Sequence, residues 1–467
     1  MILSLDLGTT NWKAALIAPD GRVTAQAALP TPVTAEDGFP CYDPAAMPAH
    51  LSALLDQLPR AEIARVALTG MAEAGVMLRR DFAPLSMIWP WFDRRALPLF
   101  ERVKDAPPFA GREAVTGLPA GFKYGVYKYL TLLETAALPA EDTCWCGLVA
   151  YAALLLTGEY AEDATLAART CCLDIRTGAW DEAFLAPLGL TEASFPRVTR
   201  SGECVGVTLP SRFGLPAGIP VHIGGHDHVC AAHAVGALET GGCFLSTGTA
   251  QVMLCTAPAI DASTGLSFGP SPAGEKYTCL GSIQSAGGSI NYWKKLLYPD
   301  GDYALLMAEA AAASPSRLIW FPYLAGRGAP QLDPHARGGL IGLADDTARG
   351  EIIAAVYEGV AMETRAVLTR MGFSAGQTIA CLGGLTRHSA YMQTLADVTG
   401  AEVVVPAVDE GTLYGAARLA DPSLPPLTPA TRYAPDPRRH AFFTRRYETR
   451  YLPLTRLMRT EESPWIE

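Results

Sequence analysis

The chain has 467 residues, 49% of them hydrophobic and 18% charged, an ordinary globular composition with material for two or three domains. Its 47 acidic residues exceed its 37 lysines and arginines, giving a net charge of −10, so the general electrostatic footprint of a nucleic-acid-binding protein is absent. The first residues do not form a signal peptide, and no run of 18 apolar residues predicts a membrane span.

The eleven cysteines are scattered and contain no C-x-x-C pair. The closest neighbours are Cys144 with Cys146, and Cys171 with Cys172. In a chain of this size without an export signal, this pattern predicts reduced, mostly buried thiols and a cytoplasmic location.

The opening residues predict a β-meander. Residues 2–7 are an apolar run carrying one acid and predict a strand; after the turn at 8–11, a second strand is expected at 12–18 and a third at 22–29. Further along, 65–71 predicts a buried strand. Helices are expected at 46–58, 129–138 and 148–158.

The pattern at the start returns in the middle of the chain. Residues 241–255 again combine an apolar strand, a tight turn of Gly and Thr, and a returning apolar strand. This similarity predicts two related halves, 1–233 and 234–467, joined through the Pro- and Gly-rich stretch 209–225. A second Pro-rich connector, 421–437, is expected before the tail.

Two Gly/Thr hairpins that face each other would form a phosphate clamp, since glycine allows close backbone approach and the N–H and hydroxyl groups can bind phosphate oxygens. Asp6, just before the first turn, could hold Mg²⁺ through water, and Lys13 could add positive charge. A third glycine pair, Gly383–Gly384, ends an apolar strand before a predicted helix, where a flat base or ribose could approach the backbone.

Four of the eight histidines lie between Val221 and His233, around Asp227. The glycines before Asp227 end a predicted strand, so this carboxylate is expected at a helix N-terminus, where negative charge is favourable. No zinc-binding spacing fits the histidines: His228 and His233, five residues apart, would lie about 140° apart on a helix. Beside a phosphate clamp, Asp227 could accept the proton of an attacking hydroxyl.

These motifs together resemble the FGGY carbohydrate kinases. The matching segments are "LSLDLGTTNWKAALI" (3–17), "GGHDH" (224–228), "LSTGTAQV" (245–252), 323–343, the signature at 338–358 and "GGLTRHSAYMQTLADVTGAEVVVP" (383–406). The resemblance covers residues 1 to about 450. It implies an α/β, actin-like ATPase fold of two ribonuclease-H-like domains with a cleft between them, and transfer of phosphate from ATP–Mg²⁺ to a sugar or polyol hydroxyl.

The resemblance also assigns roles to individual residues. Asp227 would be the general base and, with Asp6, would hold Mg²⁺ through water. The ATP-binding set would be Thr9, Thr10, Lys13, Thr247, Gly248, Thr249, Gly288, Gly383 and Gly384. The sugar-binding set would be Glu73, Trp91, Asp93, Lys123, His226 and His228, with Arg95 beside them.

Some positions depart from relatives. Glu73 matches an acidic residue of glycerol kinases, but Ala72 replaces their arginine, which disfavours glycerol itself. Thr131 replaces a tryptophan of the N-terminal signature, and Lys123 stands where glycerol kinases have tyrosine, so it could contact a polar or acidic sugar.

The arginine- and aromatic-rich tail, 438–459, is expected to be a helix packed on the protein. Relatives are often dimers or tetramers, which is consistent with a homodimer.

Two other functions are compatible with parts of the sequence. One is a non-kinase ATPase or sugar-binding protein with the same fold; the other is a zinc hydrolase that uses the histidines of 222–233. Sugar-stimulated ATP consumption would separate the first from a kinase, and stoichiometric zinc would support the second. The sequence specifies neither the sugar nor the hydroxyl.

Overall fold

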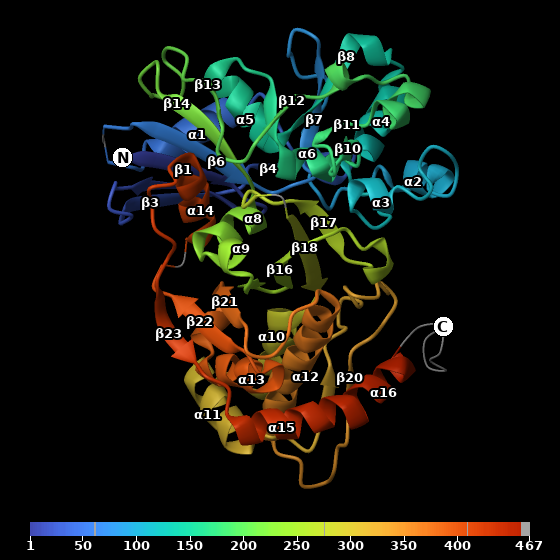
Figure 1. The fold of residues 1–467 in the computed structure, drawn as a ribbon, viewed down its shortest axis with the longest axis vertical. Helices are drawn as coiled ribbons and strands as arrows, with labels where there is room; N and C mark the ends of the chain where they lie inside the picture. The colour runs from blue at the N-terminus through green and yellow to red at the C-terminus, as the bar shows by residue number, and fades with distance from the viewer. Residues whose placement is uncertain (60–61, 275, 409, 459–467) are drawn as a thin grey trace.

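The computed structural model describes residues 1–59, 62–274, 276–408 and 410–458. Two lobes, each built on a mixed β-sheet, lie one above the other in Figure 1. Among the described residues, no helix combines the length and the apolar character needed to cross a membrane.

The first sheet has six strands, in the order β13-β14-β6-β1-β2-β3. β1, β2 and β3 form the expected antiparallel meander, while β6 and β14 extend it in parallel from β1. The strands are β1 (Ile2–Leu7), β2 (Asn11–Ile17), β3 (Val23–Pro30), β6 (Arg65–Gly70), β13 (Cys204–Val207) and β14 (Pro220–His226).

The second sheet repeats this topology and adds one edge strand, in the order β17-β18-β16-β15-β21-β22-β23. β15, β16 and β18 repeat the meander, and β21 and β22 repeat the parallel pair. The strands are β15 (Cys243–Thr247), β16 (Gln251–Ala257), β17 (Ser267–Pro270), β18 (Tyr277–Ile283), β21 (Thr378–Leu382), β22 (Glu402–Pro406) and β23 (Pro429–Tyr433). The predicted two-copy architecture is therefore confirmed.

Five short strand pairs and fourteen helices complete the lobes in the described part of the chain, besides α8 and α14, which join the lobes. The pairs are β4 (Val33–Glu36) with β5 (Phe39–Tyr42), β7 (Gly75–Arg79) with β8 (Thr143–Gly147), β9 (Ala161–Asp163) with β12 (Arg197–Thr199), β10 (Leu173–Asp174) with β11 (Ala179–Trp180), and β19 (Ile319–Phe321) with β20 (Gly339–Ile341). The helices are α1 (Met47–Leu55), α2 (Leu97–Val103), α3 (Glu113–Thr116), α4 (Gly125–Ala136), α5 (Leu148–Thr157), α6 (Ala164–Ala167), α7 (Glu182–Leu185), α9 (Ala237–Thr240), α10 (Ala286–Leu297), α11 (Tyr303–Ala313), α12 (Arg349–Arg370), α13 (Ser389–Thr399), α15 (Pro437–Arg446) and α16 (Leu452–Thr455).

Two helices at equivalent positions in the two halves join the lobes: α8 (Asp227–Ala234) follows β14, and α14 (Gly411–Ala420) follows β22. Each also packs on the other lobe's sheet. Apolar residues of α8 meet Phe244 and Leu254 of the second sheet, and α14 packs on Ile2 and Ile17 of the first. In Figure 1, α14 accordingly lies beside β1 in the upper lobe.

The helices α8 and α14 approach closely where they pack together. A Cβ on Gly415 would lie 1.8 Å from the carbonyl oxygen of Cys230, so only glycine fits there. The other large buried residues form two clusters within the first lobe and one centred on the second sheet, which also includes Leu173 and Ile175 of the first lobe.

The structure also settles smaller expectations. All eleven cysteines are free thiols and ten are buried, Cys204 being the exposed one. The helix expected directly after Gly384 is a 3₁₀ turn over 384–387 followed by α13, and the Pro-rich connector contains the edge strand β23. The tail packs as predicted: Phe443 and Tyr451 are fully buried, and Arg439 pairs with Asp397. The last residue of that predicted segment, 459, lies outside the described residues.

Candidate active site

Asp227 begins α8 at the junction of the lobes, directly after β14, as predicted. Its side chain is 24% exposed, and its Oδ1 accepts a hydrogen bond from the His228 backbone N–H at 2.6 Å. The same oxygen lies 3.2 Å from His226 Nε2 and 3.9 Å from His228 Nδ1. Burial lowers the pKa of His226 to about 4, although Asp227 acts in the opposite direction, so the imidazole beside this carboxylate is neutral at pH 7.

The other two histidines of the sequence cluster lie elsewhere. His222 Nδ1 bonds the carbonyl oxygen of Gly202 at 2.9 Å, and His233 pairs with Glu239 at 2.9 Å on the far end of α8. His226 and His228 converge on Asp227 because the chain turns from strand to helix between them, a geometry that an ideal helix does not provide.

Asp6, at the end of β1, lies close to Asp227. Burial raises the pKa of Asp6 to about 8, and the negative charges of Asp227 and Glu410 add to that effect while Lys13 opposes it. Its buried Oδ1 has no hydrogen-bond partner. This oxygen lies in a group of three carboxylates, Asp6, Asp227 and Glu410, with the single ammonium of Lys13. A carboxylate oxygen without a hydrogen-bond partner in such a group suits a hard divalent cation such as Mg²⁺. The donor set therefore fits the predicted ion.

Lys13 lies opposite Asp6 on β2 and connects the two lobes. Its ammonium forms an ion pair with Glu410, the residue before α14, at 2.8 Å. Both side chains are partly exposed, 33% and 23% respectively. The predicted phosphate-binding lysine is therefore beside the second lobe, but its charge is paired in this structure.

The first Gly/Thr hairpin is held at the junction by neighbouring side chains. Thr31 donates to the carbonyl oxygen of Gly8 at 2.8 Å, and Trp91 Nε1 donates to the hydroxyl of Thr9 at 3.0 Å. Thr10 is exposed. The candidate sugar-side tryptophan thus touches the candidate phosphate hairpin directly.

The second hairpin connects β15 to β16 and borders the third glycine pair. Thr247 is buried and donates to the carbonyl oxygen of Leu382, whereas Gly248 and Thr249 are exposed. The N–H of Gly288, near the start of α10, donates to the carbonyl oxygen of Thr249 at 3.0 Å. The hydroxyl of Thr247 therefore ties two strands together, while the exposed turn remains open to a ligand.

Gly383 has a φ of 102°, and a Cβ there would lie 2.8 Å from the carbonyl oxygen of Thr247. Gly384 is exposed, and a Cβ on it would meet no atom within 4 Å. The glycine pair therefore brings bare backbone to the second hairpin, as a nucleotide-binding turn requires.

Glu73 is the centre of a charged cluster in the first lobe. Its Oε1 accepts from Arg169 Nε at 2.9 Å and lies 3.3 Å from Lys123 Nζ. Burial alone would raise the pKa of Glu73, but the positive charges of Arg169 and Lys123 lower it well below its usual range. Lys123 is the exposed member, at 39%, so one cation of this cluster faces solvent.

Lys128, on α4, is a buried lysine that joins two candidate sugar-binding segments. Its ammonium donates to the carbonyl oxygens of Glu73 and Pro90, both at 2.6 Å, and lies 3.4 Å from that of Trp89. Glu73 has a φ of 60°, uncommon for a residue with a side chain. Lys128 therefore holds the strained turn at Glu73 against the segment that leads to Trp91.

Asp93 and Arg95 form a pair beneath this segment. Arg95 Nη2 donates to Asp93 at 2.7 Å and its Nη1 to Glu36 at 2.5 Å, while its guanidinium lies 4.0 Å from the Trp89 ring. The side chain of Asp93 is fully buried. These contacts make the pair a support for the 89–95 turn, with Trp91, 42% exposed, as the accessible side chain.

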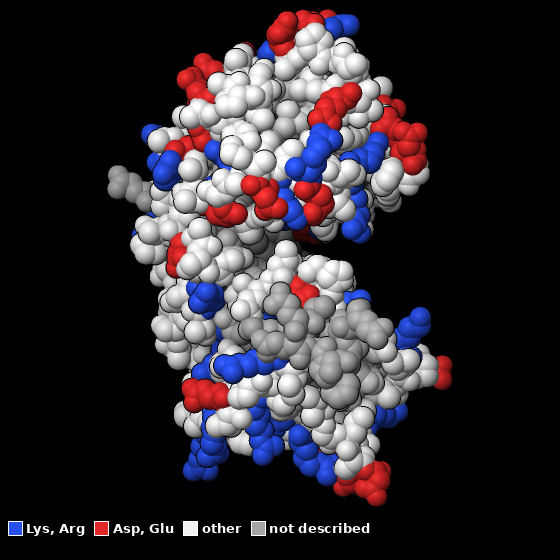
Figure 2. Space-filling view, turned by 90° about the vertical axis from the view of Figure 1, so that its right-hand side faces the viewer, with Lys and Arg blue, Asp and Glu red and all other residues white. Residues whose placement is uncertain are grey.

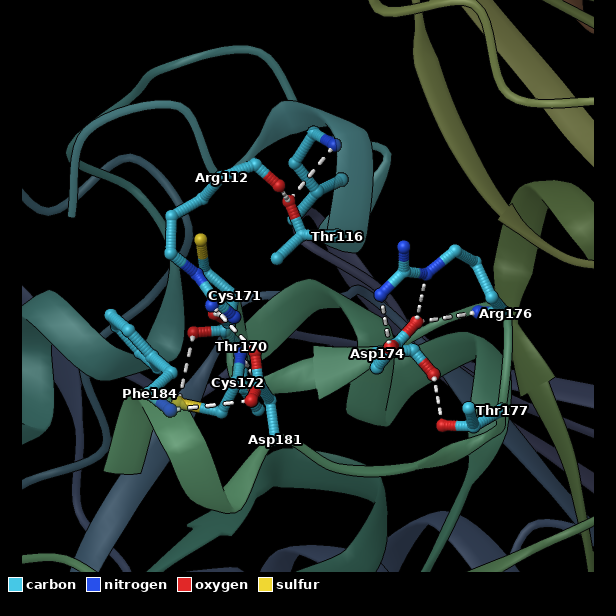
Figure 3. Close-up of polar contacts among 11 residues, drawn as sticks. Arg112, Thr116, Thr170, Cys171, Cys172, Asp174, Arg176, Thr177, Asp181 and Phe184 are labelled. Carbon is cyan, nitrogen blue, oxygen red and sulfur yellow. Dashed lines mark hydrogen bonds and ion pairs between the residues drawn. The ribbon is translucent and has the colours of Figure 1, made fainter. Parts of the chain in front are cut away.

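The segment that carries Arg169 is anchored from behind by Arg112 (Figure 3). Arg112 forms an ion pair with Asp181 at 2.6 Å, donates to the carbonyl oxygen of Cys171, and lies 3.7 Å from the Phe184 ring. Cys171 has a φ of 68°, where the chain turns out of the short helix containing Arg169. The anchor fixes that turn and hence the partner of Glu73.

Glu162 lines a small internal pocket together with Glu73 and Arg169. It is 2% exposed, and its Oε2 has no hydrogen-bond partner. Burial, with a contribution from Asp163, raises its pKa to about 8. The folded protein therefore holds a proton here that the unfolded chain releases above about pH 4.5.

Replacing Glu162 by Gln should make the protein more stable at pH 8 but not at pH 5. The contribution of the Glu162 proton to the free energy of unfolding is fully present below about pH 4.5. As the pH rises further, this contribution falls by at most ~1.4 kcal/mol per pH unit and is lost near pH 8. The amide keeps the shape without titrating. Thermal unfolding of wild type, Glu162→Gln and the exposed control Glu134→Gln would test this; equal pH slopes in all three would contradict it.

A hollow separates the two lobes on the face shown in Figure 2. Acidic and basic side chains alternate along the upper rim, while much of its lining is neither acidic nor basic.

Sequence reasoning missed four residues of this site: Arg169, Lys128, Glu162 and Glu410. Only Lys128 left a local signal, a lysine between the apolar and aromatic residues of a helix. The other three reach the site through contacts between distant parts of the chain.

A two-lobed actin-like fold with paired Gly/Thr hairpins and an acid at the lobe junction suits nucleotide-dependent phosphoryl transfer. Residues 1–234 match the N-terminal domain, and 237–421 the C-terminal domain, of the FGGY family of carbohydrate kinases. The chain belongs to this family.

Individual relatives agree with this assignment. The chain is 31% identical to a glycerol kinase of Allorhizobium ampelinum and 29% identical to one of Oleidesulfovibrio alaskensis, each match covering 90% of this chain and 89% of the relative. Its fold is similar to that of a gluconate kinase from Lactobacillus acidophilus (TM-score 0.89, 22% identity, 98% of each chain). A xylulose kinase from Rhodospirillum rubrum gives a TM-score of 0.86 at 25% identity, covering 97% of this chain and 98% of that one.

Proposed function

We propose that this carbohydrate kinase transfers the γ-phosphoryl group of ATP to a hydroxyl of a ketose or sugar acid, with Asp227 as general base. The observation that carries the proposal is the position of Asp227: it is partly exposed at the lobe junction and close to Asp6, which leads into the first hairpin. His226 Nε2 lies 3.2 Å from the same carboxylate, and the charges of Arg169 and Glu73 act on that imidazole.

In this proposal Asp227 accepts the proton of the substrate hydroxyl as that oxygen attacks phosphorus. The hairpin turns at Thr9 and Gly248 hold the phosphates, and Gly383 and Gly384 flank the nucleoside. Asp6 and Asp227 would hold Mg²⁺, which neutralises phosphate charge during transfer. Closure of the lobes would exclude water as a competing acceptor.

The sugar would lie between Trp91 and the Glu73 cluster. Glu73 is fixed by Arg169, so its ionised carboxylate can accept hydrogen bonds from sugar hydroxyls. Ala72 is small and buried, and it offers no counterpart to the arginine of glycerol kinases. These features favour a substrate larger than glycerol.

ADP release coupled to a colour reaction, with pentuloses, hexuloses, tetroses, polyols and sugar acids as acceptors, tests the proposal. One ketose or sugar acid should be phosphorylated with a kcat/KM at least about 100-fold above that for glycerol. Comparable turnover of glycerol, or no sugar-stimulated ADP release with any acceptor, would contradict it. The second outcome would favour a binding protein or another ATPase of this fold.

Lys123 tests the sugar subsite separately. Replacing it by Met removes the exposed cation and should raise the KM for the best acceptor roughly 10-fold, leaving the KM for ATP unchanged. Lys104→Met, an exposed lysine paired with Glu101 on α2, is the matched control. Unchanged KM values for all acceptors in Lys123→Met would remove this residue from the subsite.

A further inference from the structure

Among the described residues, His226, Asp227 and His228 form the one group of three or more His, Cys, Asp or Glu side chains whose ligand atoms all lie within 4.8 Å of one another. Asp227 Oδ1 is 3.2 Å from His226 Nε2 and 3.9 Å from His228 Nδ1. The two rings meet edge to face, 5.3 Å apart, so both point toward the same carboxylate.

These separations are close to those around a transition-metal ion. Bonds of about 2.0–2.1 Å in a tetrahedral arrangement place neighbouring ligand atoms roughly 3.4 Å apart. The pair formed by His226 and Asp227 already has this spacing. His228, whose side chain is 28% exposed, needs only a small ring rotation to complete a set of three.

The buried and the partly exposed members of this group suit an open site. His226 is 8% exposed, and its backbone N–H is fixed by Thr165 Oγ1 at 2.9 Å. Asp227 and His228 are partly exposed, so solvent can reach a fourth position on the ion. Three protein ligands with one open position are typical of a zinc site that binds water or substrate.

We propose that His226, Asp227 and His228 directly bind an imidazole-preferring divalent ion such as Zn²⁺ or Co²⁺, and that the bound ion blocks the sugar site. The blocking step rests on the proposed function: an ion held by His226, Asp227 and His228 would occupy the place of the reacting sugar hydroxyl and so compete with the sugar. The site is distinct in chemistry from that at Asp6: imidazole ligands favour Zn²⁺ and Co²⁺, whereas Mg²⁺ prefers oxygen.

Binding can be measured without catalysis. Purified full-length protein, freed of metal with a chelator, is titrated with Co²⁺ at pH 7.5, and its visible d–d absorption and bound metal per chain are recorded. One Co²⁺ per chain with the strong absorption of a low-coordinate ion is expected, displaced by Zn²⁺. His226→Ala and His228→Ala should each weaken binding at least about 10-fold.

His335→Ala is the matched control, because His335 is exposed and lies outside this group. It should bind Co²⁺ like the wild type. Unchanged Co²⁺ affinity in the double variant H226A/H228A, or only the weak spectrum of six-coordinate cobalt, would overturn the metal site. Circular dichroism of each variant establishes that it is folded.

Inhibition is a separate readout. In the ADP-release assay at saturating Mg²⁺–ATP, Zn²⁺ should raise the apparent KM for the sugar, and the effect should be at least about 10-fold weaker in His228→Ala than in His335→Ala. Inhibition competitive with ATP instead would overturn the blocking step. If no acceptor is phosphorylated, the proposed function fails, while Co²⁺ binding still decides the metal site.

Discussion

Replacing Asp227 by Asn is expected to lower kcat for sugar phosphorylation by about 10³-fold while leaving ADP affinity unchanged. The amide has the same shape but cannot accept the proton of the attacking hydroxyl, and general-base catalysis contributes about 10²–10⁴-fold. Steady-state kinetics with the best acceptor give kcat, and isothermal titration calorimetry gives the Kd for ADP.

Asp20→Asn is the control, because Asp20 is exposed and pairs with Arg22 at the turn between β2 and β3. A kcat within about threefold of wild type in Asp227→Asn would remove this residue as the base. A lost affinity for ADP would instead point to a role in nucleotide binding.

Replacing Lys128 by Met should raise the KM for the sugar substantially, with kcat/KM falling about 10²-fold, and leave the KM for ATP unchanged. The methionine fills the volume but cannot donate to the carbonyl oxygens of Glu73 and Pro90, so the two segments that position the sugar are released from each other. Misplacement by about 1 Å costs about 10²-fold. Lys128 is a positioning residue, since its ammonium touches backbone and not the substrate.

The pH dependence of stability provides a second readout for Lys128. Burial lowers its pKa to about 7, although Glu73 and Asp93 oppose the shift. The Lys128 amine therefore binds its proton less tightly in the folded protein than in the unfolded chain. Below about pH 7 the ammonium is charged in both states and lowers the free energy of unfolding by its full amount. Between about pH 7 and about pH 10.5 the folded protein loses the proton first, so the free energy of unfolding rises with pH. Lys128→Met should unfold with a flatter pH profile between these values.

Lys128→Arg, which keeps donors at this position, should recover part of the kcat/KM that Met loses. Lys104→Met controls for loss of a lysine in the same lobe. Equal changes in the KM for sugar and for ATP would contradict a positioning role, because general loss of folded protein does not discriminate between the two substrates.

The sequence predicted those parts of the site that are local in the chain. The meander of β1 to β3, its repeat at β15 and β16, and Asp227 at the first position of α8 all follow from apolar runs interrupted by Gly and Thr. Each of these patterns needs fewer than about 30 residues, within which strand periodicity and turn chemistry determine the structure.

The remaining site residues depend on contacts that no local pattern encodes. Arg169 reaches Glu73 across 96 positions, and Glu410 reaches Lys13 across 397. Such pairs exist because the topology brings the elements together. The apolar composition of α4 predicts that it is buried, but not that Lys128 is buried with it, since lysines usually extend to solvent.

The histidines illustrate a different limit. Ideal helix geometry correctly predicts that His228 and His233 point in different directions. It does not predict that His226 and His228 lie close together. Their convergence comes from the bend between the last residue of β14 and the first turn of α8, where neither a strand nor a helix geometry applies.

The contact between Gly415 and Cys230 determines how the molecule can open and shut. With no room for even a methyl group between them, α8 and α14 cannot slide along each other without a clash, so relative motion of the lobes is expected to be a rotation about their crossing. Asp227 lies three residues, or about 4.5 Å of helix rise, from Cys230 and so sits near the axis. The aspartate then stays almost still as the enzyme cycles, while segments far from the axis, such as α15, sweep the widest arcs.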